Sequence, residues 1–356
     1  MAVYAAKASA ATVDPPSDWP HGWPFPPEGG PDGPWPPGFP DDIEDTILVR
    51  QSTTTAKYSQ DDGDTWSNVT LPFGSTSTNR IWCGSGNLLY FINPGSVSGG
   101  VQTIACYLSL DGGMTWNTRG TISLTTAGTT SLYCACYDDM LYLSTMPDGN
   151  EYATGLSVWY SSDGGATFTE NVIVASAFGG GVPKDIATLS DGTVAVLYDD
   201  YAAGTDCYTS ATKGVTFAKA GTIPLYGGNI RWLAADAADD NLVATGSGGM
   251  QFSSDSGATW ASKSTTAHGA CVSYGDNMLS CISSKLRQSA DNGATWTDSD
   301  ALAVSTAMAH SLAAWSNGFA VMSVNKIYVS TTTSGFVVTD ADPGVTVRGF
   351  HLIEET

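Results

Sequence analysis

The chain has 356 residues, of which 42% are hydrophobic and 14% charged, and its formal net charge is −21. This length allows one large all-β domain or two small ones, and the hydrophobic content is enough for a buried core. Because like charges repel, so acidic a chain is not expected to hold nucleic acid or an anionic membrane as its main partner. We also expect no membrane insertion, since no run approaches the length of a membrane span.

The seven cysteines are an odd number, and most of them lie in apolar runs typical of strands. No C-x-x-C pair occurs, so we predict no zinc site and no other metal or cofactor. The cysteines are interpreted as buried free thiols of a protein that folds in a reducing compartment. The first residues, MAVYAAKASAATVDPP, have no sustained apolar core, so we expect no signal peptide.

Residues 1–45 differ in composition from residues 46–356, and we treat them as a separate N-terminal arm. From residue 14 the arm is rich in proline, which predicts an extended, polyproline-like segment that does not fold alone. Aromatic residues stand between the prolines, as grooves on a partner protein would require. These predicted anchors are Trp19, Trp23, Phe25, Trp35 and Phe39. The alternative interpretation is a plain spacer.

From residue 46 onward the chain repeats one octet, best seen at Ser109–Trp116, which reads S-x-D-x-G-x-T-W. Full matches stand at Ser59–Trp66, Ser253–Trp260 and Ser289–Trp296; Ser161–Phe168 changes only the aromatic residue, Ser210–Phe217 lacks the Asp, and a copy near Ser330 is almost erased. Successive octets begin 50, 52, 49, 43, 36 and 41 residues apart. A repeat at this period indicates an array of similar structural units.

The residue types of the octet predict a hairpin turn. Ser and Asp side chains accept hydrogen bonds from backbone amides a few residues further on, and the constant Gly suits a positive φ. The Thr and the aromatic residue then begin the next strand. We therefore interpret the repeated carboxylates as turn residues and not as catalytic or metal-binding groups. They are Asp61, Asp111, Asp163, Asp255 and Asp291.

In these residues the chain resembles the Asp-box, or BNR-repeat, β-propellers of the sialidase-like superfamily, and the resemblance covers roughly residues 45–356. It implies an all-β propeller in which each blade has four short strands and the octet joins the third strand to the fourth. Such propellers include sialidases, other glycosidases, sorting receptors, photosystem assembly factors and virion proteins. The resemblance therefore implies a fold without selecting a function.

Residues 80–83, 88–91 and 102–109, with the strand after Trp116, supply the template for one blade. The stretch before the first octet supplies one strand too few for a blade, and residues 345–353 supply one spare strand. Pairing of this C-terminal strand with the first blade would close the ring and remove an exposed sheet edge. We thus predict seven blades closed by the C-terminal strand, preceded by the extended Pro-rich arm.

When the first strands of the blades are aligned, six of the seven begin with a basic residue. These are Arg80, Lys184, Arg231, His268, His310 and Arg348. If they share one level around the channel mouth, they form a basic collar that would attract an anionic ligand, which an Arg could bind in a bidentate manner. The alternative interpretation is that each pairs with an acid on the neighbouring blade.

Long loops between the second and third strands of blades 2–4 raise acidic and aromatic residues over one part of the rim. Loops on a rigid scaffold often carry binding residues, although solvated turns have the same composition. The rim candidates are Asp148, Glu151, Tyr152, Asp199, Asp200 and Tyr201, with Asp206 beside them.

The resemblance to sialidases implies three arginines for a substrate carboxylate, a Tyr–Glu nucleophile pair and an Asp acid/base. Arg80, Arg231 and Arg348 could imitate the arginines, but the family's R-I-P motif reads Arg80-Ile81-Trp82 here. Sialidases also have six blades, and only Glu151 is placed near the expected face. No P-loop or H-E-x-x-H motif occurs. We therefore predict a protein without catalytic activity.

The function that we expect is that of a structural or binding subunit of a larger assembly. The assembly favoured by the arm, the missing signal peptide and the free thiols is a bacteriophage virion, with a head-decoration or tail-associated subunit assembled in the host cytoplasm. Residues 14–45 would bind other protein subunits, and the propeller would face outward and contact host glycans. The alternatives are a sialidase-like glycoside hydrolase and an assembly factor like the photosystem family.

Overall fold

The computed structural model describes residues 46–50, 54–59, 65–71, 81–85, 88–125, 132–146, 155–175, 181–200, 204–224, 230–236, 239–282, 285–299, 312–315, 318–323, 326–330, 339–341 and 350–353. Over these ranges the chain forms strands, turns and bends, and no helix. The predicted arm, with Trp19, Trp23, Phe25, Trp35 and Phe39, lies outside the described residues, as does Asp61. Their predicted roles remain predictions.

Each described strand belongs to a sheet of four antiparallel strands, and we number these sheets in chain order. Sheet 1 contains β1 (Thr46–Arg50), β2 (Thr55–Ser59), β3 (Ser67–Thr70) and the C-terminal β28 (Phe350–Ile353); sheet 2 contains β4 (Ile81–Ser85), β5 (Leu88–Ser98), β6 (Val101–Ser109) and β7 (Asn117–Thr125); sheet 3 contains β8 (Tyr133–Tyr137), β9 (Met140–Thr145), β10 (Leu156–Ser161) and β11 (Thr169–Val174). Sheet 4 contains β12 (Val182–Thr188), β13 (Val194–Asp200), β14 (Gly204–Ser210) and β15 (Ala218–Ile223); sheet 5 contains β16 (Ile230–Ala235), β17 (Leu242–Gly246), β18 (Gly249–Ser253) and β19 (Ala261–Ser264). Sheet 6 contains β20 (Cys271–Tyr274), β21 (Asn277–Ile282), β22 (Lys285–Ser289) and β23 (Thr297–Ser299); sheet 7 contains β24 (Leu312–Trp315), β25 (Gly318–Ser323), β26 (Lys326–Ser330) and β27 (Thr339–Ala341).

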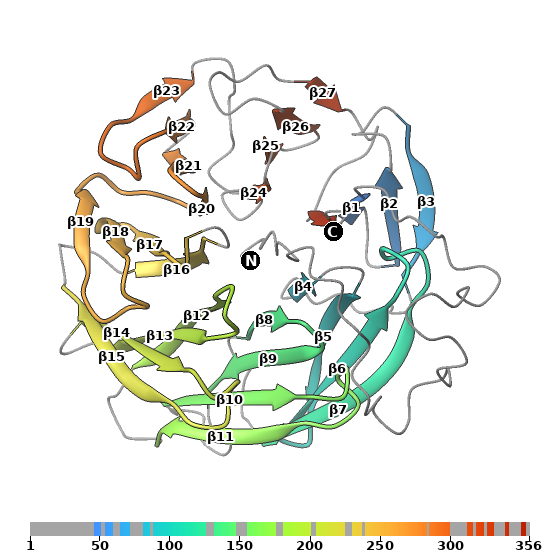
Figure 1. Ribbon diagram of the computed structural model, residues 1–356. Coiled ribbons are helices and arrows are strands. Elements are labelled where there is room, and N and C mark those ends of the chain that lie inside the picture. Colours follow the sequence, from blue (N-terminus) through green and yellow to red (C-terminus); the bar gives the residue numbers. More distant parts are fainter. Residues whose placement is uncertain are drawn as a thin grey trace, which may run out of the picture.

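The sheets stand around a common centre, as Figure 1 shows, with the first strand of a sheet toward the middle and the last toward the outside. First strands of successive sheets lie side by side, such as β4 with β8 and β12 with β16. In sheet 1 the C-terminal strand takes the inner place, because β28 pairs with β1 in the register Ile47↔Leu352 and Val49↔Phe350. The predicted all-β class with four-stranded antiparallel units is confirmed.

The core lies between neighbouring sheets. Middle strands are covered on both faces, and every residue of β9 is buried. The outermost strands β7 and β11 instead carry exposed positions. One cluster joins sheets 2 and 3 and includes Tyr90, Ile92, Leu141 and Leu143. Stacking of sheet faces explains why the middle strands read as continuous apolar runs in the sequence.

The octets form the predicted turns. In sheet 2, Ser109 Oγ accepts a hydrogen bond from the Gly113 amide at 2.7 Å, and Asp111 Oδ1 accepts from the Thr115 amide at 2.8 Å. Thr115 Oγ1 also donates to Asp111 Oδ2. The same bonds recur around Asp163, Asp255 and Asp291. Four of the five predicted turn carboxylates therefore lie in turns with this hydrogen-bond geometry.

The octet turns also join one sheet to the next. On β7, Arg119 Nε donates to the Gly164 carbonyl at 3.0 Å and Arg119 Nη2 to the Asp163 carbonyl at 2.7 Å. On β11, Asn171 Nδ2 donates to the Gly214 and Val215 carbonyls at 3.1 and 2.8 Å. We call such a contact an octet latch: the outer strand of one sheet holds the octet turn of the following sheet.

Candidate functional site

The strand pair β13–β14 carries three of the acidic residues that the sequence places on the rim. In its register Asp199 pairs with Thr205 and Tyr198 pairs with Asp206. Because paired residues share a face and successive residues alternate, Asp199 and Asp206 point to opposite faces of sheet 4. The two carboxylates therefore do not face each other across a common cleft.

On one face, Asp199 is neutralised by Lys184. A bulge between Pro183 and Asp185 in β12 sets Lys184 beside it, and Lys184 Nζ lies 3.0 Å from Asp199 Oδ2. The Asp199 side chain is only 2% exposed and Lys184 16%. Asp199 Oδ2 receives no well-directed hydrogen bond, so the contact is electrostatic. Lys184 thus pairs with an acid of its own sheet, and not with one on the neighbouring sheet.

On the other face, Asp206 Oδ1 lies 2.8 Å from Lys219 Nζ and accepts a hydrogen bond from Thr222 Oγ1 at 2.8 Å. The hydrogen bond to Asp206 raises the pKa of Lys219, whose side chain is 47% exposed. Tyr198 and Tyr208 lie on this face too, edge to face with ring centroids 6.5 Å apart.

Burial raises the pKa of both tyrosines, and the charges of Asp200 and Asp206 add to the effect. The Tyr198 hydroxyl accepts a hydrogen bond from the Gly181 amide at 2.7 Å. We call Tyr198, Asp200, Asp206, Tyr208 and Lys219 the rim cluster. It combines aromatic edges, carboxylate acceptors and an ammonium donor, a set that can orient hydroxyl or amide groups of a ligand.

Sequence reasoning missed Tyr198, Tyr208 and Lys219. The signal was present, because β13 and β14 alternate with period two and Tyr198, Asp206 and Tyr208 share a face in the hairpin register. Of the other rim candidates, Asp200 is half-buried in β13. Asp148, Glu151, Tyr152 and Tyr201 lie outside the described residues.

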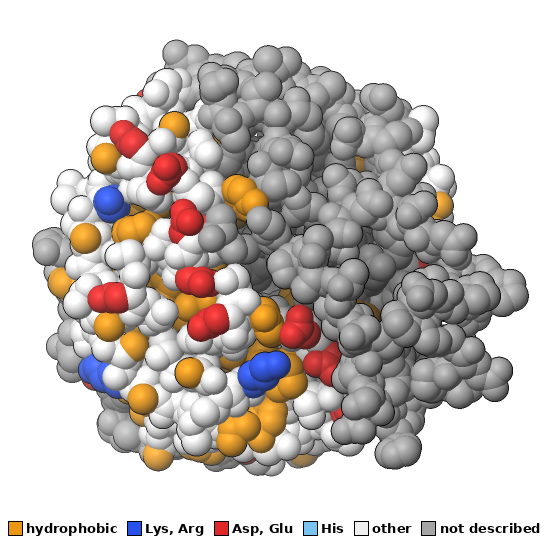
Figure 2. All heavy atoms as spheres, viewed as in Figure 1, with side chains coloured by type: hydrophobic (Ala, Val, Ile, Leu, Met, Phe, Trp, Pro, Cys, Tyr) orange, Lys and Arg blue, Asp and Glu red, His pale blue; other side chains and the backbone are white. Residues whose placement is uncertain are grey.

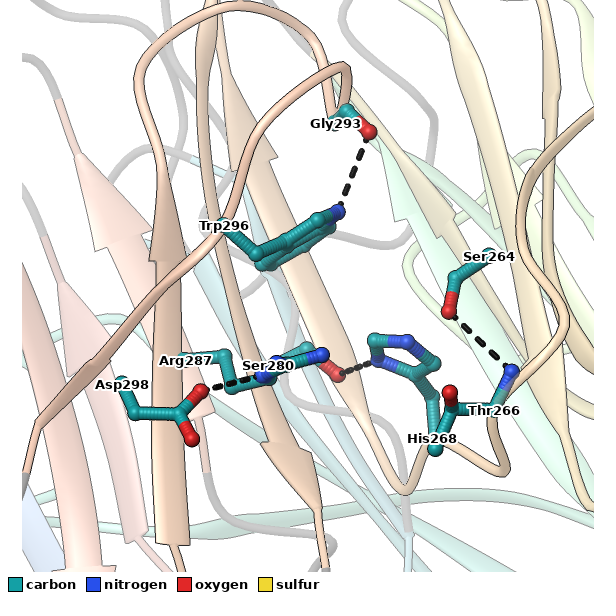
Figure 3. Close-up of polar contacts among 8 residues, drawn as sticks. All are labelled: Ser264, Thr266, His268, Ser280, Arg287, Gly293, Trp296 and Asp298. Carbon is teal, nitrogen blue, oxygen red and sulfur yellow. Dashed lines mark hydrogen bonds and ion pairs between the residues drawn. The ribbon is translucent and has the colours of Figure 1, made fainter.

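His268 differs from the expectation of a channel-lining cation. Its side chain is buried, and its ring lies 5.4 Å from that of Trp296 (Figure 3). Nδ1 is 2.8 Å from Ser280 Oγ, while Nε2 has no hydrogen-bond partner. Burial, and then the charge of Arg287, lower the pKa of His268 to about 4. The imidazole is therefore neutral near pH 7.

The described residues of the predicted basic collar do not form a ring of cations at one level. Lys184 is paired, His268 is neutral and buried, and Arg231 is exposed on β16. The physical reason is local: a bulge turns one residue toward a carboxylate, and packing encloses another. Arg80, His310 and Arg348 lie outside the described residues, and ligand binding by them stays a prediction.

A second group of charges surrounds Tyr137 at the ends of the first strands. The pKa of Tyr137 is raised by burial and by Asp138, Asp191 and Asp240. Lys213, from the octet turn without an Asp, lies 5.7 Å above the Tyr137 ring. Figure 2 shows one face of the molecule, on which acidic side chains predominate over Lys and Arg among the residues described. The net negative charge of the chain is thus visible on this face of the molecule.

Among the residues that the structure describes, no group of three His, Cys, Asp or Glu side chains could hold a metal ion. In the same part of the chain, no helix is long and apolar enough to span a membrane.

No protein-family model matches the chain. No curated protein matches it either. Solved structures do. The periplasmic gluconolactonase PpgL of Pseudomonas aeruginosa matches at a TM-score of 0.61 and 12% identity, over 88% of this chain and 99% of that one. AztD of Citrobacter koseri matches at 0.55 and 13%, over 87% and 97%, and YCF48 of Cyanidioschyzon merolae at 0.51 and 13%, over 82% and 90%.

These neighbours are β-propellers, and they agree with the ring of four-stranded sheets. The chain is a β-propeller. At 10–13% identity the likeness shows the fold alone, so the neighbours' activities do not assign one to this propeller.

Proposed function

We propose that the chain is a binding subunit of a larger assembly without catalytic activity. Its body is a seven-bladed propeller with Asp-box turns, closed by β28 in the first blade. The pairing of β28 with β1 and the repeated turn geometry support this architecture. Closure of the ring leaves no first or last sheet with an open inner edge, as a stable outward-facing domain requires.

The observation that carries a binding role is the rim cluster. Its charged groups are fixed by one another, since Asp206 is held by both Lys219 and Thr222, and two tyrosine rings flank it. A carboxylate so occupied is a poor general acid but a well-oriented acceptor. Sugar hydroxyls suit this mixture of acceptors and aromatic edges, so we propose that the rim contacts host glycans.

The anchor that we propose is the arm of residues 1–45, and the assembly is a bacteriophage virion in which the propeller decorates the head or the tail. Support comes from the sequence, which spaces aromatic residues with prolines as groove-binding segments do. A YCF48 structure with a bound D1 peptide, at a TM-score of 0.50 and 13% identity, is an example of a similar propeller that binds a peptide.

The test replaces Trp19, Trp23 and Trp35 together by Ala in the full-length chain. A matched control replaces three small polar residues exposed on β7, Thr121, Ser123 and Thr125. Each tagged protein is produced in the cell that naturally carries the gene, and particles are separated by gradient centrifugation. We expect the native and control proteins to sediment with particles and the triple Trp variant to remain unassembled. A native protein that never joins particles would contradict the virion proposal.

The rim is tested separately on the same chain. A glycan array should retain the native protein and lose binding for Tyr208→Phe with Asp206→Asn, because the hydroxyl, the negative charge and one of the two carboxylate acceptor oxygens are removed. Assays with glycosides and sugar lactones address the catalytic alternatives. Turnover that Asp206→Asn abolishes would replace the binding proposal by an enzymatic one.

A further inference from the structure

Three cysteines meet where sheets 2 and 3 adjoin near the centre of the propeller. Cys83 lies on β4, and Cys134 and Cys136 lie on the neighbouring β8. All three are buried, at 1%, 2% and 4% exposure, and belong to one apolar cluster. Cys134 and Cys136 are two residues apart on a strand, so both side chains point from the same face of it.

The three thiols lie on neighbouring strands of separate sheets. β4 and β8 lie side by side, and all three cysteines pack into the same buried cluster as free thiols. Adjacent strands from separate sheets therefore present one thiol on one side and two on the other.

Cys207 offers a contrast within the same molecule. It is fully buried as well, but its sulfur packs against the backbone of Gly257 in the next octet turn. Burial raises its pKa to about 12, and Asp206 is the ionisable group that adds to this shift. Cys207 is thus as deeply buried as the three central thiols, but the neighbour of its sulfur is a glycine and not a second thiol.

We propose that Cys83 forms a disulfide with Cys134 or Cys136, which joins the inner strands of sheets 2 and 3 when the chain meets a low-molecular-weight disulfide such as oxidised glutathione. The Cys83 thiolate attacks one sulfur of oxidised glutathione, and one glutathione leaves as thiolate. The thiolate from β8 then attacks the Cys83 sulfur and displaces the second glutathione. Two protein thiols are oxidised, one glutathione disulfide is reduced to two thiols, and the two protons pass to the released glutathiones.

The burial of the cluster determines when this happens. Desolvation raises the pKa of the Cys83 thiol and of both thiols on β8, so the closed propeller supplies almost no thiolate. Exchange therefore needs β4 and β8 to part, which occurs during folding or in partial opening. The cross-link would record the redox state of the compartment in which the propeller folds.

The experiment uses the full chain, purified reduced and incubated with oxidised glutathione in urea at the foot of its unfolding transition. Free thiols are alkylated and counted by intact mass, and the disulfide is located by peptide mapping. We expect the count to fall from seven to five and the Tm to rise by roughly 5 °C. Cys207→Ala, the matched control, should fall from six thiols to four, whereas Cys83→Ala should keep six.

Peptide mapping of the native chain decides the outcome even if a variant fails to fold. A disulfide that excludes Cys83 would overturn the proposal, as would glutathione adducts without a protein disulfide. So would seven remaining thiols under conditions in which iodoacetamide labels Cys83. Cys134→Ala and Cys136→Ala then identify the partner, and removal of both must abolish the cross-link.

Discussion

Two basic residues that the sequence alignment places at equivalent positions, Lys184 and His268, have opposite surroundings. Lys184 lies against a carboxylate that is itself inside the protein, whereas His268 lies among an aromatic ring, a hydroxyl and a guanidinium. A residue's number in an aligned repeat fixes its position along a strand. It does not fix the depth of its side chain, which depends on local bulges and on the other strands of the same sheet.

The Lys184–Asp199 pair predicts an asymmetric double-mutant cycle. Lys184→Met leaves the buried Asp199 carboxylate without its counter-ion and should lower the free energy of unfolding by about 3 kcal/mol. Lys184→Met with Asp199→Asn removes both charges and should lose clearly less. Urea unfolding at pH 7 measures both. Equal losses in the single and double variants would show that the charge on Asp199 does not matter.

His268 predicts a pH dependence between about 6.5 and 4. Its pKa is lowered in the folded chain to about 4, so the unfolded chain binds the proton first as pH falls. The contribution of the neutral His268 to the free energy of unfolding is fully present above pH 6.5. It is lost as the pH falls through this window, by about 3 kcal/mol in all. The pKa of Asp291 is lowered to about 2 by its octet hydrogen bonds, so that turn loses its charge only at more acidic pH.

The measurement is urea unfolding of the native chain and of His268→Gln at half-unit steps from pH 7 to 4. As the pH falls, the free energy of unfolding of the native chain should decrease more steeply than that of the variant. The difference in slope should correspond to the uptake of up to one proton on unfolding. Parallel pH profiles for the two proteins would refute a role for His268.

At the scale of the strand and turn, the sequence was informative wherever short-range chemistry decides the structure. The S-x-D-x-G pattern predicted each described octet turn because its hydrogen bonds are all local. The octet that lacks the Asp is instructive, since Thr212 Oγ1 accepts from the Thr216 amide at 2.9 Å in its place. The turn tolerates a hydroxyl where its relatives use a carboxylate.

Features that depend on pairing between strands or between sheets were not predictable in the same way. The bulge that turns Lys184 toward Asp199 depends on how β12 pairs with β13, and the latch from Arg119 to the next octet depends on which sheets meet. Tyr198 and Tyr208 were readable as alternating strand residues, but their meeting with Lys219 depends on the hairpin register. The arm and the long rim loops outside the described residues remain predictions.

Two octet glycines predict a graded packing effect. A Cβ at Gly257 would lie 2.6 Å from Cys207 Sγ, whereas one at Gly293 would meet side-chain atoms at 3.3–3.4 Å. Both have a positive φ, so both Ala variants share about 1 kcal/mol of backbone strain. Gly257→Ala should lose a further ~2 kcal/mol from the clash.

Thermal or urea unfolding of the two variants measures the difference, with Gly293→Ala as the matched control. Adding Cys207→Ala to Gly257→Ala should recover part of the loss, because the clashing sulfur is gone. If the effects of the two substitutions on the free energy of unfolding are simply additive, the loss in Gly257→Ala does not come from a clash with Cys207.

For the whole molecule, the arrangement of sheet 1 implies that the two ends of the propeller body depend on each other. Its innermost strand comes from residues 350–353 and its other three from residues 46–70. Deletion of residues 350–356 should therefore expose the edge of β1, lower the Tm by several degrees and promote aggregation. Deletion of residues 354–356, which keeps β28, is the control.

Light scattering and thermal unfolding of both truncated chains give the answer. Loss of monomer in the longer truncation alone supports closure by β28. If both truncated chains resemble the native one, the proposed closure does not contribute to stability. The formal charge of −21 should keep the intact protein from self-association at low salt, so aggregation in the variant would report the exposed edge.

The octet latches can form only in chain order while the protein is being synthesised. The carbonyl partners of Arg119 on β7 lie 44 and 45 residues downstream, and those of Asn171 on β11 lie 43 and 44 residues downstream. At a synthesis rate of about 5–20 residues per second, each outer strand leaves the ribosome roughly 2–9 s before its partners exist. Every nascent sheet is thus incomplete at its leading side until the next one emerges. A ribosome paused between two octets would therefore hold the last sheet with its latch unformed.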